Sequence, residues 1–148
     1  MEIDPRGPRF GAVITVVVLA AALITQSGWL LAAQAVVFAI GAAAGLRYAP
    51  YGLVYRYLIR PRLGPPAHTE AEAPPRFAQG VGAVFALAGV AGFAVGSALA
   101  GTVFAALALV AAFLNAAFDF CLGCQVYLFI KRAPAAHLAS GHGPDQEV

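Results

Sequence analysis

The sequence predicts an all-α membrane protein, a four-helix transmembrane bundle made of two helical hairpins, and three observations support this. Hydrophobic residues make up 61% of the 148 residues and charged residues only 11%, whereas a soluble domain has about 25% charged residues. All charged residues lie in three blocks, 2–9, 47–76 and 119–147. The two uncharged stretches between these blocks are each long enough for two membrane crossings.

The first uncharged stretch, Phe10 to Leu46, is expected to form the first hairpin. Small and polar residues at 26–28 interrupt it and divide it into predicted spans of about 10–26 and 29–47. Each span is near the lower length limit for crossing a hydrocarbon core of about 30 Å. Helices are expected because an open sheet edge in lipid would leave backbone polar groups without partners.

The second uncharged stretch predicts two further spans, at about 77–97 and 101–119. Pro8-Arg9-Phe10 opens the first hairpin, and Pro75-Arg76-Phe77 opens the second. This similarity suggests a parallel duplication, because both halves begin and end on the same side of the membrane. Short interfacial helices are expected after the second and fourth spans, where Pro50 and Cys121 occupy corresponding positions.

The positions of lysine and arginine predict the orientation. All nine basic residues flank the open ends of the hairpins, and none lies at a hairpin tip. The positive-inside rule therefore places the chain in the cell (inner) membrane with both termini in the cytoplasm. A proline-rich, exposed linker at 60–75 and a flexible tail at 133–148 are also expected to be cytoplasmic.

A cleaved signal peptide is the alternative to this topology. Arg6 and Arg9 precede an apolar run, and Ala33-Gln34-Ala35 loosely resembles a cleavage site. Cleavage there would leave half of the first hairpin without its partner, so the four-span arrangement is preferred.

Small and polar residues inside the spans predict how the helices pack. The glycine pairs Gly41/Gly45 and Gly92/Gly96 are small-xxx-small patterns, which let helix backbones approach closely. Gln34 and Asn115 are the most polar residues deep in the spans. They are expected to form hydrogen bonds between helices, and the alternative is a polar patch beside a substrate path.

The chain has one chemical motif, Cys121-Leu-Gly-Cys124, which contains both of its cysteines. Such a pair can form a disulfide, exchange with another dithiol or supply zinc ligands. A permanent structural disulfide is not expected in the reducing cytoplasm. If Cys121 begins a helix, the helix N-terminus favours its thiolate, so Cys121 would be the nucleophile, Cys124 the resolving thiol and Asp119 a proton acceptor. Alternatively, the two cysteines are packed thiols without reactivity.

Zinc and nucleic acid are disfavoured. Cys121, Cys124, His137 and His142 have the spacing of a zinc finger with two cysteine and two histidine ligands. However, the residues that follow Cys124 are apolar, and Pro134 stands where such a finger needs a core leucine. A net charge of +2 without a basic helix excludes the common nucleic-acid readers. We therefore predict no metal, no cofactor and no nucleic acid, and the lipid bilayer as the principal partner.

Five segments together resemble a bacterial integral membrane family known only as domain of unknown function 4395. The segments are Asp4-Pro-Arg-Gly-Pro-Arg-Phe-Gly11, Pro50-Tyr-Gly-Leu53, Arg60-Pro-Arg-Leu-Gly-Pro65, Pro75-Arg-Phe77 and Cys121-Leu-Gly-Cys124. The resemblance covers nearly the whole chain. It implies a compact multi-pass protein, sometimes encoded near thioredoxin-like or rhodanese-like proteins, and it assigns no residue roles.

Two functions are therefore expected from the sequence. The first is a membrane-embedded thiol-disulfide or sulfur-relay protein, whose cysteine pair at the cytoplasmic face reacts with a thioredoxin-like or rhodanese-like partner. The second is a non-catalytic scaffold or accessory subunit of a membrane protein complex, in which the cysteines are incidental.

Overall fold

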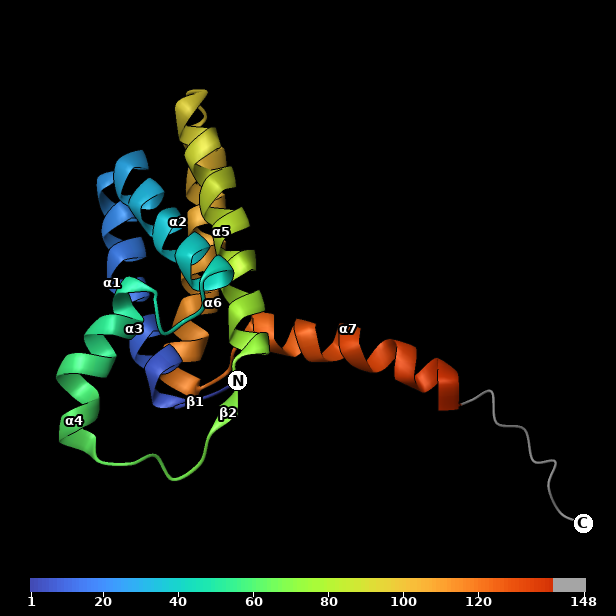
Figure 1. Cartoon of the computed structure of the whole chain (residues 1–148). Helices are drawn as coiled ribbons and strands as arrows, with labels where there is room; N and C mark the ends of the chain where they lie inside the picture. The colour runs from blue at the N-terminus through green and yellow to red at the C-terminus, as the bar shows by residue number, and fades with distance from the viewer. Residues whose placement is uncertain (140–148) are drawn as a thin grey trace, which may run out of the picture.

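The computed structural model describes residues 1–139, and these are mostly helical. The long helices form a bundle, except for the last, which projects from its side (Figure 1). The bundle consists of α1 (Arg6–Thr25), α2 (Gly28–Ala43), α5 (Ala73–Ala94) and α6 (Ala98–Phe118), and the projecting helix is α7 (Leu122–Ala139).

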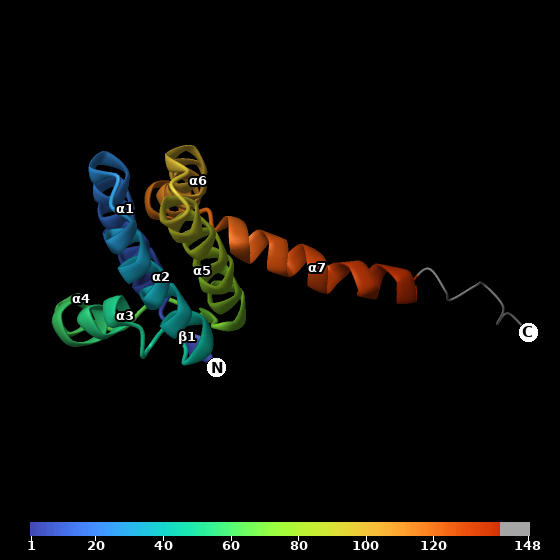
Figure 2. The same ribbon diagram turned by 90° about the horizontal axis from the view of Figure 1, so that it is seen from above.

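Shorter elements join the two hairpins. They are α3 (Pro50–Val54), the π-helical turn η1 (Tyr55–Ile59), α4 (Arg60–Leu63) and the antiparallel strands β1 (Glu2–Ile3) and β2 (Glu70–Ala71). The hairpin turns lie at one end of the bundle, whereas the short helices and α7 project from opposite sides of the other end (Figures 1 and 2).

Three helices, α1, α5 and α6, are long and apolar enough to cross a membrane, as the composition predicts. The remaining bundle helix, α2, is apolar but has only 16 residues, which correspond to about 24 Å. It is shorter than its predicted span because the chain leaves the helix at Ala44 and turns at Gly45, which has a positive φ of 105°.

Both hairpins turn through the same backbone motif. Gln26 ends α1 with a φ of 52°, and Gly96 follows α5 with a φ of 79°. The next residue in each case is a serine, Ser27 or Ser97, whose hydroxyl accepts a hydrogen bond from the backbone N–H three residues later. These Schellman-type turns satisfy the free backbone groups at the tips without any charged side chain.

The predicted close approach of helices is confirmed for the first glycine of each small-xxx-small pair, whereas the second glycine lies beyond the end of its helix. A Cβ atom on Gly92 would lie 2.6 Å from the backbone nitrogen of Gly101 on α6, and one on Gly41 would lie 2.9 Å from Gln79 Oε1 on α5. Gly45 and Gly96 instead adopt positive φ at helix ends. A left-handed residue was needed there to leave the helix.

The two hairpins pack mainly across each other, α2 against α5 and α1 against α6. Arg76, at the start of α5, donates to the carbonyl oxygens of Ala42 and Ala43 at the end of α2, over 2.8–3.2 Å. Arg9, near the start of α1, donates to the carbonyl oxygen of Ala116 near the end of α6, at 3.1 Å. The arginines of both Pro-Arg-Phe motifs thus satisfy carbonyls that lack partners within their own helices.

The next residue of each motif also makes a matching contact. The rings of Phe10 and Tyr55 lie 5.8 Å apart, and those of Phe77 and Tyr127 lie 5.6 Å apart. Tyr55 belongs to η1, which follows the first hairpin, and Tyr127 belongs to α7, which follows the second. Each hairpin therefore fixes its own following helix to the start of its first helix.

The predicted linker and tail are more ordered than expected. Within the linker, α4 and β2 are regular elements, and α5 begins at Ala73. Glu72 is only 7% exposed, and its carboxylate accepts a hydrogen bond from the Leu46 N–H, which offsets the cost of its burial. In the region predicted as tail, α7 continues through Pro134 to Ala139. The rest of that tail, residues 140–148, lies outside the described residues.

Candidate functional site

The cysteine motif lies at the start of α7. The carbonyl oxygen of Cys121 accepts a hydrogen bond from the Gln125 N–H at 3.0 Å, and its sulfur accepts one from the Cys124 N–H at 3.3 Å. Cys121 is therefore the N-cap of α7, which confirms the prediction that a new helix begins there. The two sulfurs are joined in a disulfide, with their Cα atoms 5.2 Å apart.

Asp119 lies just before this motif but belongs to the preceding helix. It ends α6 in a left-handed conformation with a φ of 55°, and its N–H donates to the carbonyl oxygen of Leu114. Its side chain is exposed. Cys121 takes the capping position of α7, and Asp119 lies two residues before it. The chain can thus change direction within two residues.

Contacts with α5 hold the cysteine motif in place. A Cβ atom on Gly123 would lie 2.6 Å from the Cα atom of Ala78, so only glycine allows the first turn of α7 to approach α5 this closely. One turn later, the ring of Tyr127 packs on Phe77. The motif is consequently anchored on the bundle, and both cysteines are half-buried.

Helix α7 leaves the bundle (Figure 2), and it carries an exposed apolar face. Four large apolar side chains on it are 39–76% exposed: Leu122, Val126, Phe129 and Ile130. Their spacing places them on one side of the helix. Such a face can bury itself in a lipid interface or against another protein.

No metal site accompanies the cysteines in the part of the chain that the structure describes. No group of three or more histidine, cysteine, aspartate or glutamate side chains there is arranged to hold an ion. His142 and the side chain of His137 fall outside the described part. The zinc-finger spacing therefore gains no support from the described residues.

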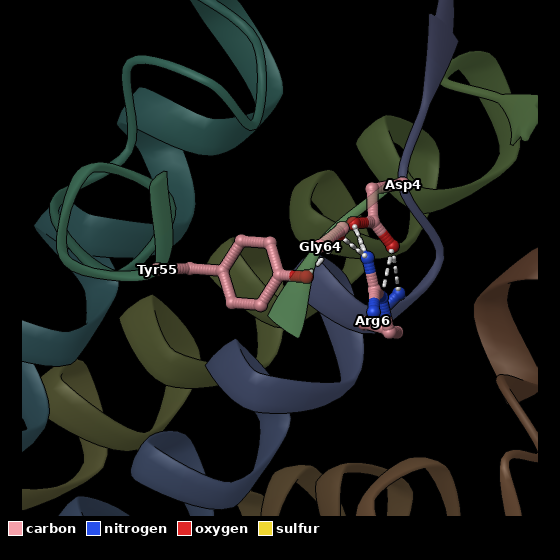
Figure 3. A network of polar contacts seen from close by, with 4 residues as sticks. All are labelled: Asp4, Arg6, Tyr55 and Gly64. Atoms are coloured by element: carbon pink, nitrogen blue, oxygen red, sulfur yellow. Dashed lines mark hydrogen bonds and ion pairs between the residues drawn. The ribbon is translucent and has the colours of Figure 1, made fainter. Parts of the chain in front are cut away.

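A second polar cluster ties the N-terminus to the segment between the hairpins (Figure 3). Arg6 donates to both carboxylate oxygens of Asp4 over 2.9–3.2 Å and to the carbonyl oxygen of Gly64 at 3.0 Å. The hydroxyl of Tyr55 donates to the same carboxylate at 2.8 Å. Burial raises the pKa of Asp4, but the hydrogen bonds from Arg6 and Tyr55 outweigh burial and lower this pKa to about 2.

A third cluster lies deeper, between α1, α2 and α3. The side chain of Gln34 is completely buried; its Oε1 accepts from the Tyr51 hydroxyl at 2.7 Å and its Nε2 donates to Thr15 Oγ1 at 3.4 Å. The predicted hydrogen bond between helices is thus confirmed for Gln34. Asn115 is half-buried near the end of α6 and takes no part in this cluster.

A family model described as Domain of unknown function (DUF4395) matches residues 3–132. The chain belongs to the DUF4395 family. This confirms the resemblance noted in the sequence. The matched region includes Asp4 and both cysteines, and it ends before His137. No curated protein and no solved structure shows significant similarity to the chain.

The structure of this DUF4395 protein also contains a cavity of about 420 Å³ that the sequence did not predict. It lies between the start of α1, the connection from α2 to α3, and η1. Its lining includes buried Thr15, half-buried Tyr51 and the exposed arginines Arg47, Arg56 and Arg60. These residues are far apart along the chain and share no local pattern. Only Tyr51 and Arg60 fall in the segments that resemble the DUF4395 family, and no sequence signal marked the other three.

Proposed function

We propose that this DUF4395 protein is an integral membrane protein that exchanges thiols and disulfides with a thioredoxin-like or rhodanese-like partner at the cytoplasmic face. Cys121 is the nucleophile, Cys124 is the resolving thiol and Asp119 accepts a proton. The observation that carries the proposal is the bonded cysteine pair at the N-terminus of a helix that is anchored on the bundle.

The chemistry follows from the position of Cys121. In the reduced protein, the N-terminus of α7 and the Cys124 N–H stabilise negative charge on the Cys121 sulfur. The Cys121 thiolate attacks a disulfide of the partner, breaks its S–S bond and forms a mixed disulfide. Cys124 then loses its proton to Asp119 and attacks the Cys121 sulfur. The partner leaves as a dithiol with two more electrons, and the membrane protein retains the Cys121–Cys124 disulfide.

A sulfur-relay variant uses the same two cysteines. The Cys121 thiolate attacks the outer sulfur of a partner persulfide. The S–S bond of the persulfide breaks, the partner cysteine leaves as a thiolate, and the transferred sulfur forms a persulfide on Cys121. Cys124 then attacks the inner sulfur and releases hydrosulfide, so the Cys121–Cys124 disulfide forms again. Both routes end in the oxidised pair, and they differ in whether the partner supplies a disulfide or a persulfide.

The membrane arrangement belongs to the same proposal. The chain crosses the cell (inner) membrane four times with both termini in the cytoplasm, and α2 serves as a short fourth span. The uncharged hairpin turns at one end of the bundle and the arginines at the other support this orientation. The matching turns, arginine caps and aromatic contacts of the two halves support a parallel duplication.

Trapping the mixed disulfide tests the function. In cells that express Cys124→Ser, Cys121 cannot be resolved, so we expect a covalent complex with a cytoplasmic protein that dithiothreitol releases. The double variant Cys121→Ala/Cys124→Ser is the matched control and should capture nothing. If the single variant also captures nothing and Cys121→Ala has no phenotype, the scaffold interpretation replaces the exchange function.

A further inference from the structure

We propose that the cavity between α1, α3 and η1 binds the phosphate group of an anionic amphiphile, with Arg47, Arg56 and Arg60 as its charged contacts. Neither cysteine lines this cavity of about 420 Å³. The short helices beside it and α7 lie on opposite sides of the bundle (Figures 1 and 2). The site is therefore distinct from the thiol site, and it does not depend on the function proposed above.

The charge of the lining favours an anion. Among the described residues, no carboxylate lies within salt-bridge distance of Arg47, Arg56 or Arg60. Asp4 and Glu2 also line the cavity, but both have partners. Two donors on Arg6 and the Tyr55 hydroxyl bind the Asp4 carboxylate, and the Thr69 hydroxyl binds the Glu2 carboxylate. The guanidinium groups of Arg47 and Arg56 lie over the rings of Tyr48 and Tyr57. No carboxylate partner of the three arginines thus competes with a phosphate, for which guanidinium groups are well suited.

The shape and the walls favour a ligand with a hydrocarbon part. The lining extends from Arg60 and the N-terminal strand to Thr15, which lies nine residues beyond the start of α1, or about 13 Å along the helix axis. Between these limits the walls include Pro8, Val37 and Leu46. The walls also carry the polar side chains of Thr15, Tyr51 and Gln79. A charged rim beside partly apolar walls matches a molecule that carries both a phosphate and an acyl chain.

The π-helical turn η1 supplies the basic side of the cavity. Arg60 ends this turn, and its N–H donates to the Tyr55 carbonyl oxygen, which is five residues earlier. Tyr55, Arg56 and Arg60 all line the cavity. Turns of this type are rare, and they occur frequently at functional sites because they change which side chains share a face. Here the turn allows Tyr55 to bind Asp4 while Arg56 and Arg60 remain at the cavity.

Lipid binding to the purified full chain tests the proposal. Native mass spectrometry would compare phosphatidylglycerol with phosphatidylcholine on the wild-type protein, on Arg47→Gln/Arg56→Gln/Arg60→Gln and on Arg62→Gln. Arg62 is the matched control because it is exposed on α4 and does not line the cavity. We expect one phosphatidylglycerol bound to the wild type and to Arg62→Gln, and about tenfold weaker binding to the triple variant.

Soluble phosphate distinguishes the source of the anion. Glycerol 3-phosphate should compete only weakly with the lipid. Val37→Trp, which fills space beside the apolar walls, should weaken the binding of phosphatidylglycerol and leave the binding of glycerol 3-phosphate unchanged. If glycerol 3-phosphate bound as tightly as the lipid, the ligand would be a soluble phosphate ester, and the proposal of an anionic amphiphile would be wrong. Equal binding of both lipids, or equal losses in Arg62→Gln and the triple variant, would overturn the site itself. Unchanged circular dichroism shows that each variant is folded.

Discussion

Arg76 caps the last turn of α2 by donating from both Nε and Nη2 to the carbonyl oxygen of Ala42, at 3.2 and 2.9 Å. The two residues lie in different hairpins, so this contact joins the halves of the molecule at one end of the bundle. Arg9 makes the corresponding contact with the end of α6. Under the positive-inside rule, such arginines indicate the orientation of a membrane protein. In this chain they also donate hydrogen bonds to backbone carbonyls at helix ends.

Replacing Arg76 should therefore weaken the fold. Arg76→Gln removes a charged donor from carbonyls at a helix C-terminus, and we expect the free energy of unfolding to fall by about 1 to 2 kcal/mol. Unfolding in mixed detergent micelles measures this. Arg62→Gln, at an exposed arginine outside these contacts, should leave the stability within about 0.5 kcal/mol of the wild type. Equal stability of the two variants would contradict the capping role.

The contact of Gly92 with α6 predicts a second effect on stability. Gly92→Ala places a Cβ atom 2.6 Å from the Gly101 nitrogen, which forces α5 and α6 apart, and we expect a loss of about 1 to 3 kcal/mol. Gly80→Ala on the same helix is the control, because its Cβ atom would meet Ala42 at an ordinary 3.9 Å. That change should be neutral or slightly stabilising. The same detergent unfolding assay compares them, and an unaffected Gly92→Ala protein would refute the close approach.

The buried Gln34 cluster can be tested at its tyrosine. Tyr51→Phe removes the hydroxyl that donates to Gln34 Oε1 and leaves this oxygen without that partner. We expect the free energy of unfolding to fall by about 0.5 to 2 kcal/mol. Tyr48→Phe serves as the control, since Tyr48 is 52% exposed. If both phenylalanine variants unfold alike, the hydrogen bond contributes nothing measurable.

The lowered pKa of Asp4 predicts how stability depends on pH. The Asp4 pKa falls from 3.8 to about 2 on folding, so the unfolded state binds the proton more tightly. The resulting stabilisation is complete above about pH 5 and is lost as the pH falls through about 2. After allowance for solvent screening it amounts to about 1 kcal/mol. Melting temperatures from pH 2 to 6 should show this loss in the wild type and in Asp119→Asn, and a smaller one in Asp4→Asn.

The proposed orientation predicts which side of the membrane exposes the cysteines. After reduction, a membrane-impermeant maleimide should label Cys121 and Cys124 in inside-out vesicles and leave them unlabelled in intact cells. A cysteine placed at Gly96, in a variant that lacks Cys121 and Cys124, should show the opposite pattern. Labelling of the native pair from outside the cell would invalidate both the orientation and the cytoplasmic partner.

Local patterns were enough to predict part of this protein. Hydrophobic composition and the spacing of charges predicted helical hairpins, because each helix must satisfy its own backbone bonds and lipid excludes charge. The helix that starts at Cys121 was predicted because Pro50 occupies the corresponding position in the first half. Gln34 was predicted to form a hydrogen bond between helices because a buried amide requires a partner. Each inference used residues that are close in sequence or a general cost of burial.

Only the tertiary structure decided the rest. Whether a glycine packs or turns depends on where its helix ends, so the glycine pattern alone did not show that Gly92 packs and Gly96 turns. The arginine caps, the Asp4 cluster and the arginine-lined cavity each join segments that are more than 30 residues apart. Such contacts arise from the packing of one hairpin across the other, and the residue periodicity within a single segment does not predict that packing.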